Sequence, residues 1–282
     1  MVIRKRFGQH FLEPAWVDKV IRAIDPKPDE AFIEIGPGAG ALTRPLAARA
    51  KAVTAYEIDR DLAAALESSA PPNLTVVEGD FLGLAATDRL MTTDRLTTHD
   101  SVLSTPDSRL SSSMLRVAGN LPYNVASPIL FKLLALHAAG LPLGDATVML
   151  QREVAERLTA EPGSRDYGVL SILIRHSARV EMILKLPAGA FRPPPKVLSA
   201  LVRLTFHAPD PPARDDAAFA GLVQAVFTRR RKTLANALLA FPPAVAATPP
   251  RMLRDAGIDG GRRPETLSIP EFVRLADALI PR

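Results

Sequence analysis

The chain has no cysteine among its 282 residues. Disulfide bonds, thiolate nucleophiles and cysteine-based zinc sites are therefore excluded, and the composition suits a reducing compartment. The sequence also lacks an apolar run of the ~18 residues that cross a membrane, because Lys132 and His137 interrupt the longest one. The first residues, MVIRKRFGQHF, have a basic head but no apolar stretch behind it, which is not typical of a secretory signal. We therefore expect a cytoplasmic protein without a membrane partner.

Metal-site spacing is missing as well, since the five histidines are scattered at positions 10, 99, 137, 176 and 207. We expect no metal. The chain does have a basic balance, with 35 Lys and Arg against 30 Asp and Glu and a pI of about 9.7. With 47% apolar residues, this composition is that of a globular protein suited to an anionic partner. No exposed apolar heptad calls for a dimer, so we expect a monomer.

Strand-like and helix-like segments alternate along the first part of the chain. Three short apolar runs are typical of buried strands: AFIEI (31–35), AVTAYEI (52–58) and LTVVEGD (74–80). The segments after the first two runs have helical spacing, which predicts βαβ units and an α/β protein whose parallel sheet is covered by helices on both faces. Further strands are expected at LRVAG, TVMLQ (147–151), VEMILKL and SALVRLTF, and a helix over 127–137 with Ser127 as its cap.

Two stretches depart from this rhythm and suggest the domain boundaries. Residues 83–113 are rich in Thr, Ser and Asp and contain TDRL twice, so we expect a surface excursion there. Residues 207–216, HAPDPPARDD, are typical of a linker. We therefore expect a catalytic domain over 1–206 and a helical domain over 207–282. In the second, Phe219, Leu222, Val223, Val226 and Phe227 share a helical face, and RRRK (229–232) is expected to continue that helix.

A glycine-rich turn follows the first predicted strand. Gly36, Gly38 and Gly40 have no side chains, so a ligand can approach their backbone. The third glycine of the dinucleotide fingerprint would fall on Ala41, and no GK[ST] of a phosphate loop follows. An NAD-dependent oxidoreductase is disfavoured by this spacing and by the lack of a proton-relay His or Tyr-Lys pair, but it stays an alternative.

Acidic residues end the next two predicted strands. Glu57 stands where a carboxylate accepts hydrogen bonds from ribose hydroxyls, and Asp80 stands where it could accept one from the amine of an adenine. Either acid alone could equally be a solvated strand end. Three strand ends that carry suitable groups together predict an adenosine-containing cofactor at the carboxyl edge of the sheet.

GNLPYN (119–124) follows a fourth predicted strand, LRVAG, and by itself it could be a surface turn. Together with RFGQHFL (6–12), EIGPGAG, YEID and the GD at Asp80, GNLPY resembles the S-adenosylmethionine-dependent ribosomal RNA adenine N6-dimethyltransferases. The resemblance spans nearly the whole chain apart from 83–113, and its further motifs are LQREVAERL, YGVLSILI (167–174), FRPPPKV (191–197) and FTRRRKTLANAL (227–238). Erythromycin-resistance methyltransferases, which act on large-subunit RNA, resemble FRPPPKV and RRRKTL less well and stay an alternative.

The resemblance implies a Rossmann-like methyltransferase sheet with a small C-terminal α-helical domain, and S-adenosylmethionine as the cofactor. It implies dimethylation of two adjacent adenosines in the 3′-terminal hairpin of small-subunit ribosomal RNA, within a pre-assembled 30S subunit during ribosome biogenesis. A non-catalytic ribosome-assembly or transcription-factor-like relative is a further alternative. The intact motifs argue against it.

The chemistry of adenine explains why Asn, Leu, Pro and Tyr suit this reaction. The exocyclic amine is a poor nucleophile because its lone pair is delocalised into the ring, so a catalyst should accept hydrogen bonds from its hydrogens. The Asn120 side-chain oxygen and the Leu121 carbonyl are suitable acceptors, and Pro122 stiffens their loop. Tyr123 offers a ring on which a flipped base can stack, worth about 1–3 kcal/mol. No strong general base is needed.

The resemblance also implies contacts for residues outside this loop. Phe191 resembles the family's second aromatic residue beside the target base, with a plain core role as the alternative. His10 stands where the family often has asparagine, and we expect it to be neutral near a sulfonium; alternatively, Phe7, Phe11 and Leu12 simply pack the arm. The expected cofactor contacts are Gln9, His10, Leu12, Gly36, Gly38, Glu57, Ile58, Asp80, Phe81 and Asn120. The expected RNA-phosphate contacts are Arg4, Lys5, Arg6, Arg229, Arg230, Arg231 and Lys232.

Overall fold

The computed structural model describes residues 10–84, 114–241 and 248–280. Contacts divide these residues into two compact units: one comprises those up to Ala155 together with Glu181–Phe206, and the other comprises Glu156–Val180 and those from His207 onward. The predicted excursion over 83–113 lies almost entirely outside the described residues.

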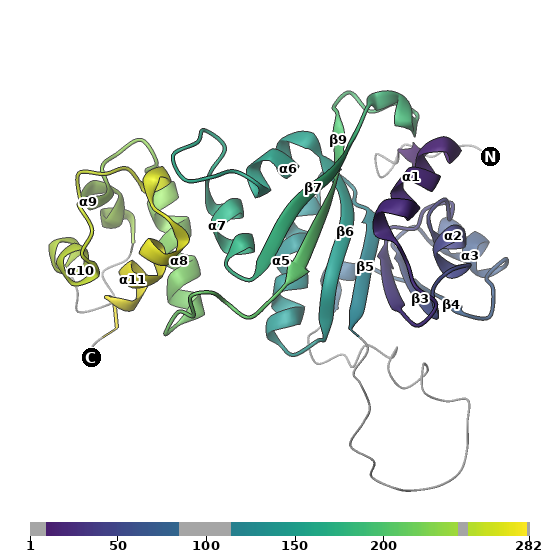
Figure 1. Ribbon diagram of the computed structural model, residues 1–282, viewed down its shortest axis with the longest axis horizontal. Helices are drawn as coiled ribbons and strands as arrows, with labels where there is room; N and C mark the ends of the chain where they lie inside the picture. Colours follow the sequence, from purple (N-terminus) through teal and green to yellow (C-terminus); the bar gives the residue numbers. More distant parts are fainter. Residues whose placement is uncertain (1–9, 85–113, 242–247, 281–282) are drawn as a thin grey trace, which may run out of the picture. The chain divides into compact units, whose positions relative to one another are not determined.

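A seven-stranded sheet organises the first unit (Figure 1). Its spatial order is β4-β3-β2-β5-β6-β9-β7. The strands are β2 (Ala31–Ile35), β3 (Ala52–Glu57), β4 (Leu74–Glu78), β5 (Leu115–Asn120), β6 (Leu143–Gln151), β7 (Ala178–Leu186) and β9 (Ser199–Phe206). The pairs β4–β3, β3–β2, β2–β5 and β5–β6 are parallel, which confirms the predicted α/β fold, whereas β9 runs antiparallel to β6.

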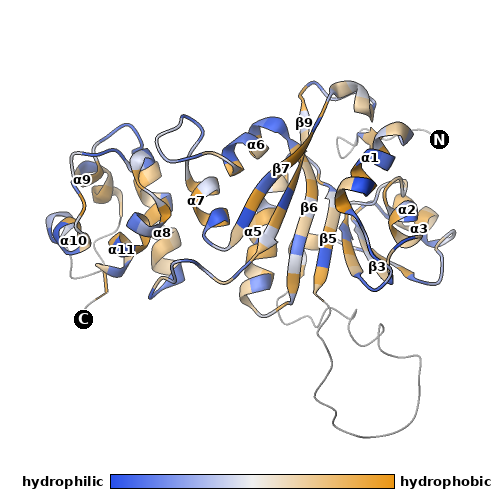
Figure 2. Cartoon of the chain, viewed as in Figure 1, coloured by the Kyte–Doolittle hydropathy of each residue, from blue (hydrophilic) through white to orange (hydrophobic). Residues whose placement is uncertain are grey.

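The edge strand β7 differs from the parallel strands in how its residues are buried. In β7 exposure alternates along the strand, whereas β2 and β3 are buried throughout. A strand buried on both faces is typical of a parallel sheet between helices, and alternation is typical of antiparallel strands with one wet face. Figure 2 shows the same contrast as alternating blue and orange along β7.

Helices flank the parallel strands. The helical elements that lie wholly or partly in the first unit are, in chain order, α1 (Pro14–Ile24), α2 (Thr43–Ala47), α3 (Arg60–Glu67), η2 (Phe81–Gly83), α5 (Ala126–Ala138), α6 (Arg152–Leu158) and η3 (Ala188–Ala190). Helix α3 begins after Asp59, whose carboxylate accepts from the backbone N–H groups of Asp61 and Leu62. The cap of helix α5 is Val125, two residues before the predicted cap Ser127, so Ser127 lies in the first turn of the helix.

A second, two-stranded sheet pairs β1 (Phe11–Leu12) with β8 (Phe191–Arg192) in antiparallel register. Leu12 lies opposite Phe191, so the amino-terminal segment is held beside FRPPPKV. Nothing in the local sequence predicted this pair, because each strand has two residues and the partners are about 180 positions apart.

The second unit is built mainly from helices. They are α7 (Val169–Arg175), α8 (Asp216–Phe227), α9 (Leu234–Ala237), η4 (Leu238–Ala240), α10 (Pro249–Ala256), η5 (Pro264–Thr266) and α11 (Ile269–Asp277). The predicted apolar face of α8 is buried at Phe219, Leu222, Val223 and Val226. No helix among the described residues has both the length and the apolar character needed to span a bilayer.

The prediction that RRRK continues this helix is wrong. Helix α8 ends at Phe227, and Thr228 Oγ1 donates back to the carbonyl of Ala225. Arg229 N then bonds the carbonyl of Val226, three residues back, so the last turn tightens and the chain leaves the helix. The four basic residues therefore lie in the turns that precede α9.

Candidate active site

The order in which the chain adds strands to the sheet changes direction between β2 and β5. From β2 the chain builds outward through β3 to β4, and it then returns to place β5 on the other side of β2. Ligands of open α/β sheets bind at the carboxyl ends of the strands beside such a switch point. Here the strands β4, β3, β2 and β5 are direct neighbours, so their ends lie side by side over about 14 Å. This edge is the candidate active site.

The glycine turn leaves β2 at this edge in a conformation that other residues rarely adopt. Gly36, Gly38 and Gly40 have φ values of 69°, 57° and 82°. A Cβ on Gly38 would lie 3.2 Å from the ring of Phe11, and a Cβ on Gly36 would lie 3.7 Å from the carbonyl oxygen of Asn120. The turn thus runs close to both the amino-terminal segment and the end of β5, with bare backbone at the switch point.

Glu57, at the end of β3, holds this turn in place. Its Oε2 accepts from Gly38 N at 2.8 Å and its Oε1 accepts from Asp59 N at 2.9 Å, and the residue is only 3% exposed. Burial raises the pKa of the carboxyl, and the two backbone donors oppose that shift. Each oxygen of an ionised carboxylate has a second lone pair, so these two bonds do not use its whole capacity as an acceptor. Its structural role was not predicted.

The neighbouring strand ends offer an apolar surface and a second carboxylate. Ile58 is 51% exposed although it directly follows a buried strand. Asp80 is exposed, and its Oδ1 accepts from Leu82 N at 2.9 Å. Phe81 is buried, and its ring packs edge-on against Tyr56 with 5.6 Å between centroids. Ile58 and Asp80 are thus exposed at this edge, whereas Phe81 is buried against Tyr56.

The segment GNLPY occupies the end of β5 beside the glycine turn. Gly119 is required there because a Cβ would lie 2.5 Å from the carbonyl oxygen of Ile35. The Asn120 side chain donates from Nδ2 to the carbonyl of His10 at 2.8 Å, so its Oδ1 is turned the other way as an acceptor. Leu121 is buried and donates its N–H to the carbonyl of Met149. The amide of Asn120 therefore has a fixed orientation.

Tyr123 is held from two sides. Its hydroxyl lies 2.6 Å from Ser199 Oγ on β9, and its burial raises the pKa of the phenol. The imidazole of His10 stacks on the tyrosine ring, with 5.8 Å between centroids and 27° between planes. His10 Nδ1 lies 2.7 Å from the carbonyl of Pro193, so that nitrogen carries the donated proton. The structure thus brings His10 to Asn120 and Tyr123.

Leu12 and Phe191 lie opposite each other in the β1–β8 pair, and both belong to the hydrophobic core. Phe191 is 1% exposed, which agrees with the alternative that it is a core residue. Gln9 and the first basic cluster, Arg4, Lys5 and Arg6, lie outside the described residues.

Sequence reasoning missed Glu34, in the middle of β2. This residue is 1% exposed, its Oε2 has no hydrogen-bond partner, and the hydroxyl of the buried Thr43 lies nearby. Burial raises the pKa of Glu34 to about 8, which favours its neutral form at neutral pH. An acid inside the apolar run AFIEI was the signal available in the sequence.

The second basic cluster is mostly exposed, but one member is used within the second unit. Arg229, Arg231 and Lys232 are exposed. Arg230 is partly buried, donates to the carbonyl of Ser164 at 3.1 Å and pairs with Glu265. Three of the four cations are therefore presented to solvent. In the part of the chain that the structure describes, no group of His, Cys, Asp and Glu could hold a metal ion.

Comparison with known proteins agrees with this architecture. The family model described as ribosomal RNA adenine dimethylase matches residues 2–279. Two relatives, both named ribosomal RNA small subunit methyltransferase A, come from Acinetobacter baylyi and Bordetella avium. The first is 42% identical over 99% of this chain and 93% of its own length, and the second is 43% identical over 98% and 95%.

Two solved structures are similar over nearly the whole chain. One is a dimethyladenosine transferase from Plasmodium falciparum, with a TM-score of 0.69 and 25% identity over 94% of this chain and 96% of that one. The other is the 23S rRNA methyltransferase ErmE, with a TM-score of 0.61 and 27% identity over 95% and 99%.

Proposed function

Because the chain belongs to the ribosomal RNA adenine dimethylase family, we propose that it dimethylates N6 of two adjacent adenosines in small-subunit ribosomal RNA with S-adenosylmethionine. The observation that carries the proposal is the edge where Asp80, Glu57, the glycine turn and Asn120 follow one another on four neighbouring strands.

The strand ends on the β2–β4 side fit the cofactor. Glu57 would accept from the ribose hydroxyls, Ile58 would pack against the adenine ring, and Asp80 would accept from its amine. The positive-φ glycines leave the backbone bare where the methionine end would lie, next to Leu12 and His10. When bound, S-adenosylmethionine supplies an electrophilic methyl group on a sulfonium.

The β5 side fits the target base. Asn120 Oδ1 and the Leu121 carbonyl accept from the N6 hydrogens of adenine, which favours a pyramidal nitrogen with a free lone pair. The fixed amide of Asn120 means that little reorganisation is needed when the base arrives. Tyr123, held by Ser199, offers the stacking surface, and Phe191 supports this region from the core.

The wider setting belongs to the same proposal. The RNA is bound within a pre-assembled 30S subunit in the cytoplasm, and the enzyme acts as a monomer. Arg229, Arg231 and Lys232, together with Arg4, Lys5 and Arg6, contact RNA phosphates and add salt-dependent affinity without base specificity; Arg230 contributes less because Glu265 shares its charge.

The test offers immature small subunits and large-subunit RNA in parallel, with labelled methyl donor, and maps the modified bases. We expect two adjacent dimethylated adenosines in the small-subunit RNA and none in the large. Methylation of the large-subunit RNA alone would instead favour the activity of the erythromycin-resistance methyltransferases. ErmE, the 23S rRNA methyltransferase of similar structure, is named for that kind of substrate. Calorimetry with S-adenosylmethionine and with NAD tests the cofactor, and only the first should bind.

A further inference from the structure

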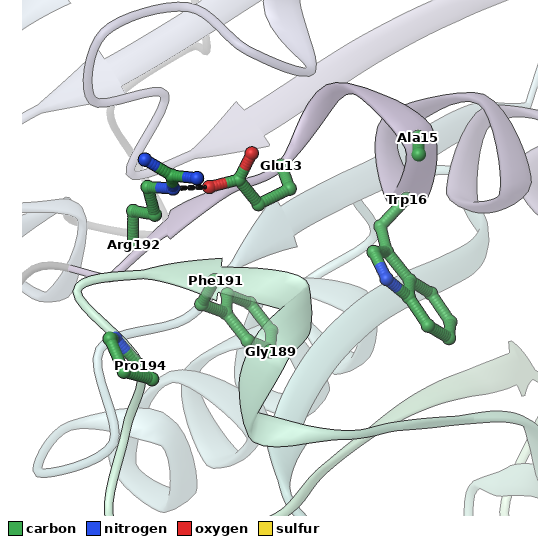
Figure 3. A pocket seen from close by; sticks show the side chains of 7 residues that line it. All are labelled: Glu13, Ala15, Trp16, Gly189, Phe191, Arg192 and Pro194. Atoms are coloured by element: carbon green, nitrogen blue, oxygen red, sulfur yellow. Dashed lines mark ion pairs between the residues drawn. The ribbon is translucent and has the colours of Figure 1, made fainter.

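A surface pocket of about 430 Å³ lies beside the β1–β8 pair, within the first unit. It is lined by Glu13, Ala15, Trp16, Gly189, Phe191, Arg192 and Pro194. Figure 3 shows that Trp16 comes from the first turn of α1 and Glu13 from the residue before it, whereas Arg192 and Pro194 come from the segment that contains β8. This volume is within the range of pockets that hold small organic groups.

The walls of the pocket suit a flat aromatic ring. Trp16 packs partly against the hydrophobic core, which limits its motion, and Lys19 Nζ lies 4.1 Å from the centroid of its ring. Pro194 adds exposed apolar surface on the other segment, whereas Phe191, at 1% exposure, adds little. Tryptophan gives a large stacking surface at a low cost in conformational entropy, and a nucleobase is the planar group that such sites bind in RNA.

The charges of the pocket favour a base over a phosphate in its interior. The carboxylate of Glu13 forms an ion pair with Arg192 Nε, and the Glu13 side chain is 26% exposed whereas that of Arg192 is 84% exposed. A carboxylate repels a phosphate but accepts a hydrogen bond from an exocyclic amine or a ring N–H. Lys19 and Lys196 are exposed cations that can bind the phosphates on either side of such a base, and Arg192 contributes less because Glu13 shares its charge.

The position of the pocket relates it to the candidate active site. Glu13 follows directly after Leu12, and His10, three residues earlier, contacts both Asn120 and Tyr123. Three residues of extended chain span about 10 Å, which is within reach of a nucleotide next to one whose base lies at Asn120.

We propose that this pocket binds the nucleobase adjacent to the target adenosine, so that one adenine of the pair is held by Trp16 while the other is methylated. The inference rests on the proposed function, since it assumes that the substrate is a ribosomal RNA with two neighbouring adenosines. It assigns to Trp16, Glu13 and Arg192 a substrate contact outside the methyl-transfer site.

The kinetic test uses immature small subunits as substrate for four variants of the full chain. Trp16→Ala should raise the KM for the subunits roughly tenfold and leave kcat within about twofold, because stacking is lost from the ground state and the transition state alike. Arg192→Ala should raise KM less, and Trp16→Phe should retain most of the affinity. Lys51→Ala is the control for Arg192→Ala, because it removes an exposed cation at the amino end of β3. It should change neither KM nor kcat.

Two controls separate this inference from folding and from the proposed function. Calorimetric affinity for S-adenosylmethionine should be the same in all four variants, which shows that Trp16→Ala still folds. Unchanged KM in Trp16→Ala with intact cofactor affinity would overturn the pocket assignment while leaving the methyltransferase proposal in place. Absence of methyl transfer by the unmodified protein would instead overturn the proposed function.

A spectroscopic test uses the fact that Trp16 is the single tryptophan of the chain. Stacking with a nucleobase quenches indole emission, so titration with the 3′-terminal small-subunit RNA hairpin should quench this residue. The same hairpin with one adenosine of the pair made abasic should quench it at most half as much. Anisotropy of each labelled hairpin shows when binding is saturated. Equal tryptophan emission with the two hairpins at saturation would contradict the proposal.

Discussion

The two sides of the switch point are stabilised in different ways. On the β3 side, Glu57 is held by Gly38 and Asp59, which are 19 and 2 positions away in the sequence. On the β5 side, Asn120 and Tyr123 are held by His10 and Ser199, which are 110 and 76 positions away. The proposed cofactor side is therefore a local structure, and the proposed base side depends on the assembled fold. Variants that disturb one side and spare the other test this difference.

The largest effect is expected for Asn120→Ala. It removes the acceptor for the N6 hydrogens, and loss of one fixed polar partner in an active site lowers kcat by about 10²–10³-fold. Affinity for S-adenosylmethionine should fall far less, because Glu57, Ile58 and Asp80 are untouched. Initial rates on immature small subunits and calorimetry measure the two quantities. Asn124→Ala, an exposed asparagine of the same loop, is the control, and an equal loss in both variants would contradict the assignment.

Glu57→Ala should affect the other side. It leaves the N–H groups of Gly38 and Asp59 without their acceptor, which costs about 1–3 kcal/mol of unfolding free energy, and it removes the proposed ribose contact. We expect a loss of affinity for S-adenosylmethionine of roughly tenfold or more. Urea unfolding and calorimetry provide the measurements. Glu67→Ala, at the exposed end of α3, should change neither, and retained affinity in Glu57→Ala would refute the cofactor role.

The buried acid Glu34 in β2 predicts a dependence of stability on pH. The pKa of Glu34 is raised from 4.5 to about 8 by burial, so the folded chain keeps a proton that the unfolded chain loses above about pH 4.5. Folding therefore takes up a proton, and the unfolding free energy should fall as the pH rises from about 4.5 to about 8. At about 1.4 kcal/mol per pH unit, this shift corresponds to a fall in unfolding free energy of at most about 5 kcal/mol, and that contribution should disappear in Glu34→Gln, which stays neutral at every pH.

Urea unfolding of the wild type and Glu34→Gln at about pH 5, 6.5 and 8 checks this expectation. The raised pKa of Glu57 acts in the same direction, so Glu34→Gln should keep a smaller slope. Identical slopes in the two proteins would mean that Glu34 is ionised in the fold.

The smallest effect is expected at the bond between Tyr123 and Ser199. Tyr123→Phe keeps the ring but loses a hydrogen bond worth about 1 kcal/mol, so kcat/KM should fall roughly fivefold. Ser199→Ala should have a similar effect, and the double variant should be no worse than either single one because the two changes remove the same bond. Additive losses would show that the hydroxyl groups act separately.

The sequence predicted the parts of this structure that depend on local pattern. The apolar runs that became β2, β3 and β4, and the buried face of α8, were identified from periodicity that burial then enforces. Glu57 and Asp80 were predicted as site residues because acids that end such runs meet at one edge of a parallel sheet, and that role stays a prediction.

The remainder depends on contacts between distant segments. The β1–β8 pair, and the bonds from Asn120 to His10 and from Tyr123 to Ser199, join residues with no local signal for pairing. The predicted helical continuation through RRRK was wrong because helical spacing does not reveal where the last carbonyls find other donors. Thr228 supplies one such donor.

The most direct measurement is a crystal structure of the protein with S-adenosylmethionine bound. The account predicts the adenine between Ile58 and Asp80, the ribose hydroxyls at Glu57, and the sulfonium methyl directed toward Asn120 and Leu121. A donor bound away from the switch point, or one whose methyl group points away from the end of β5, would contradict it.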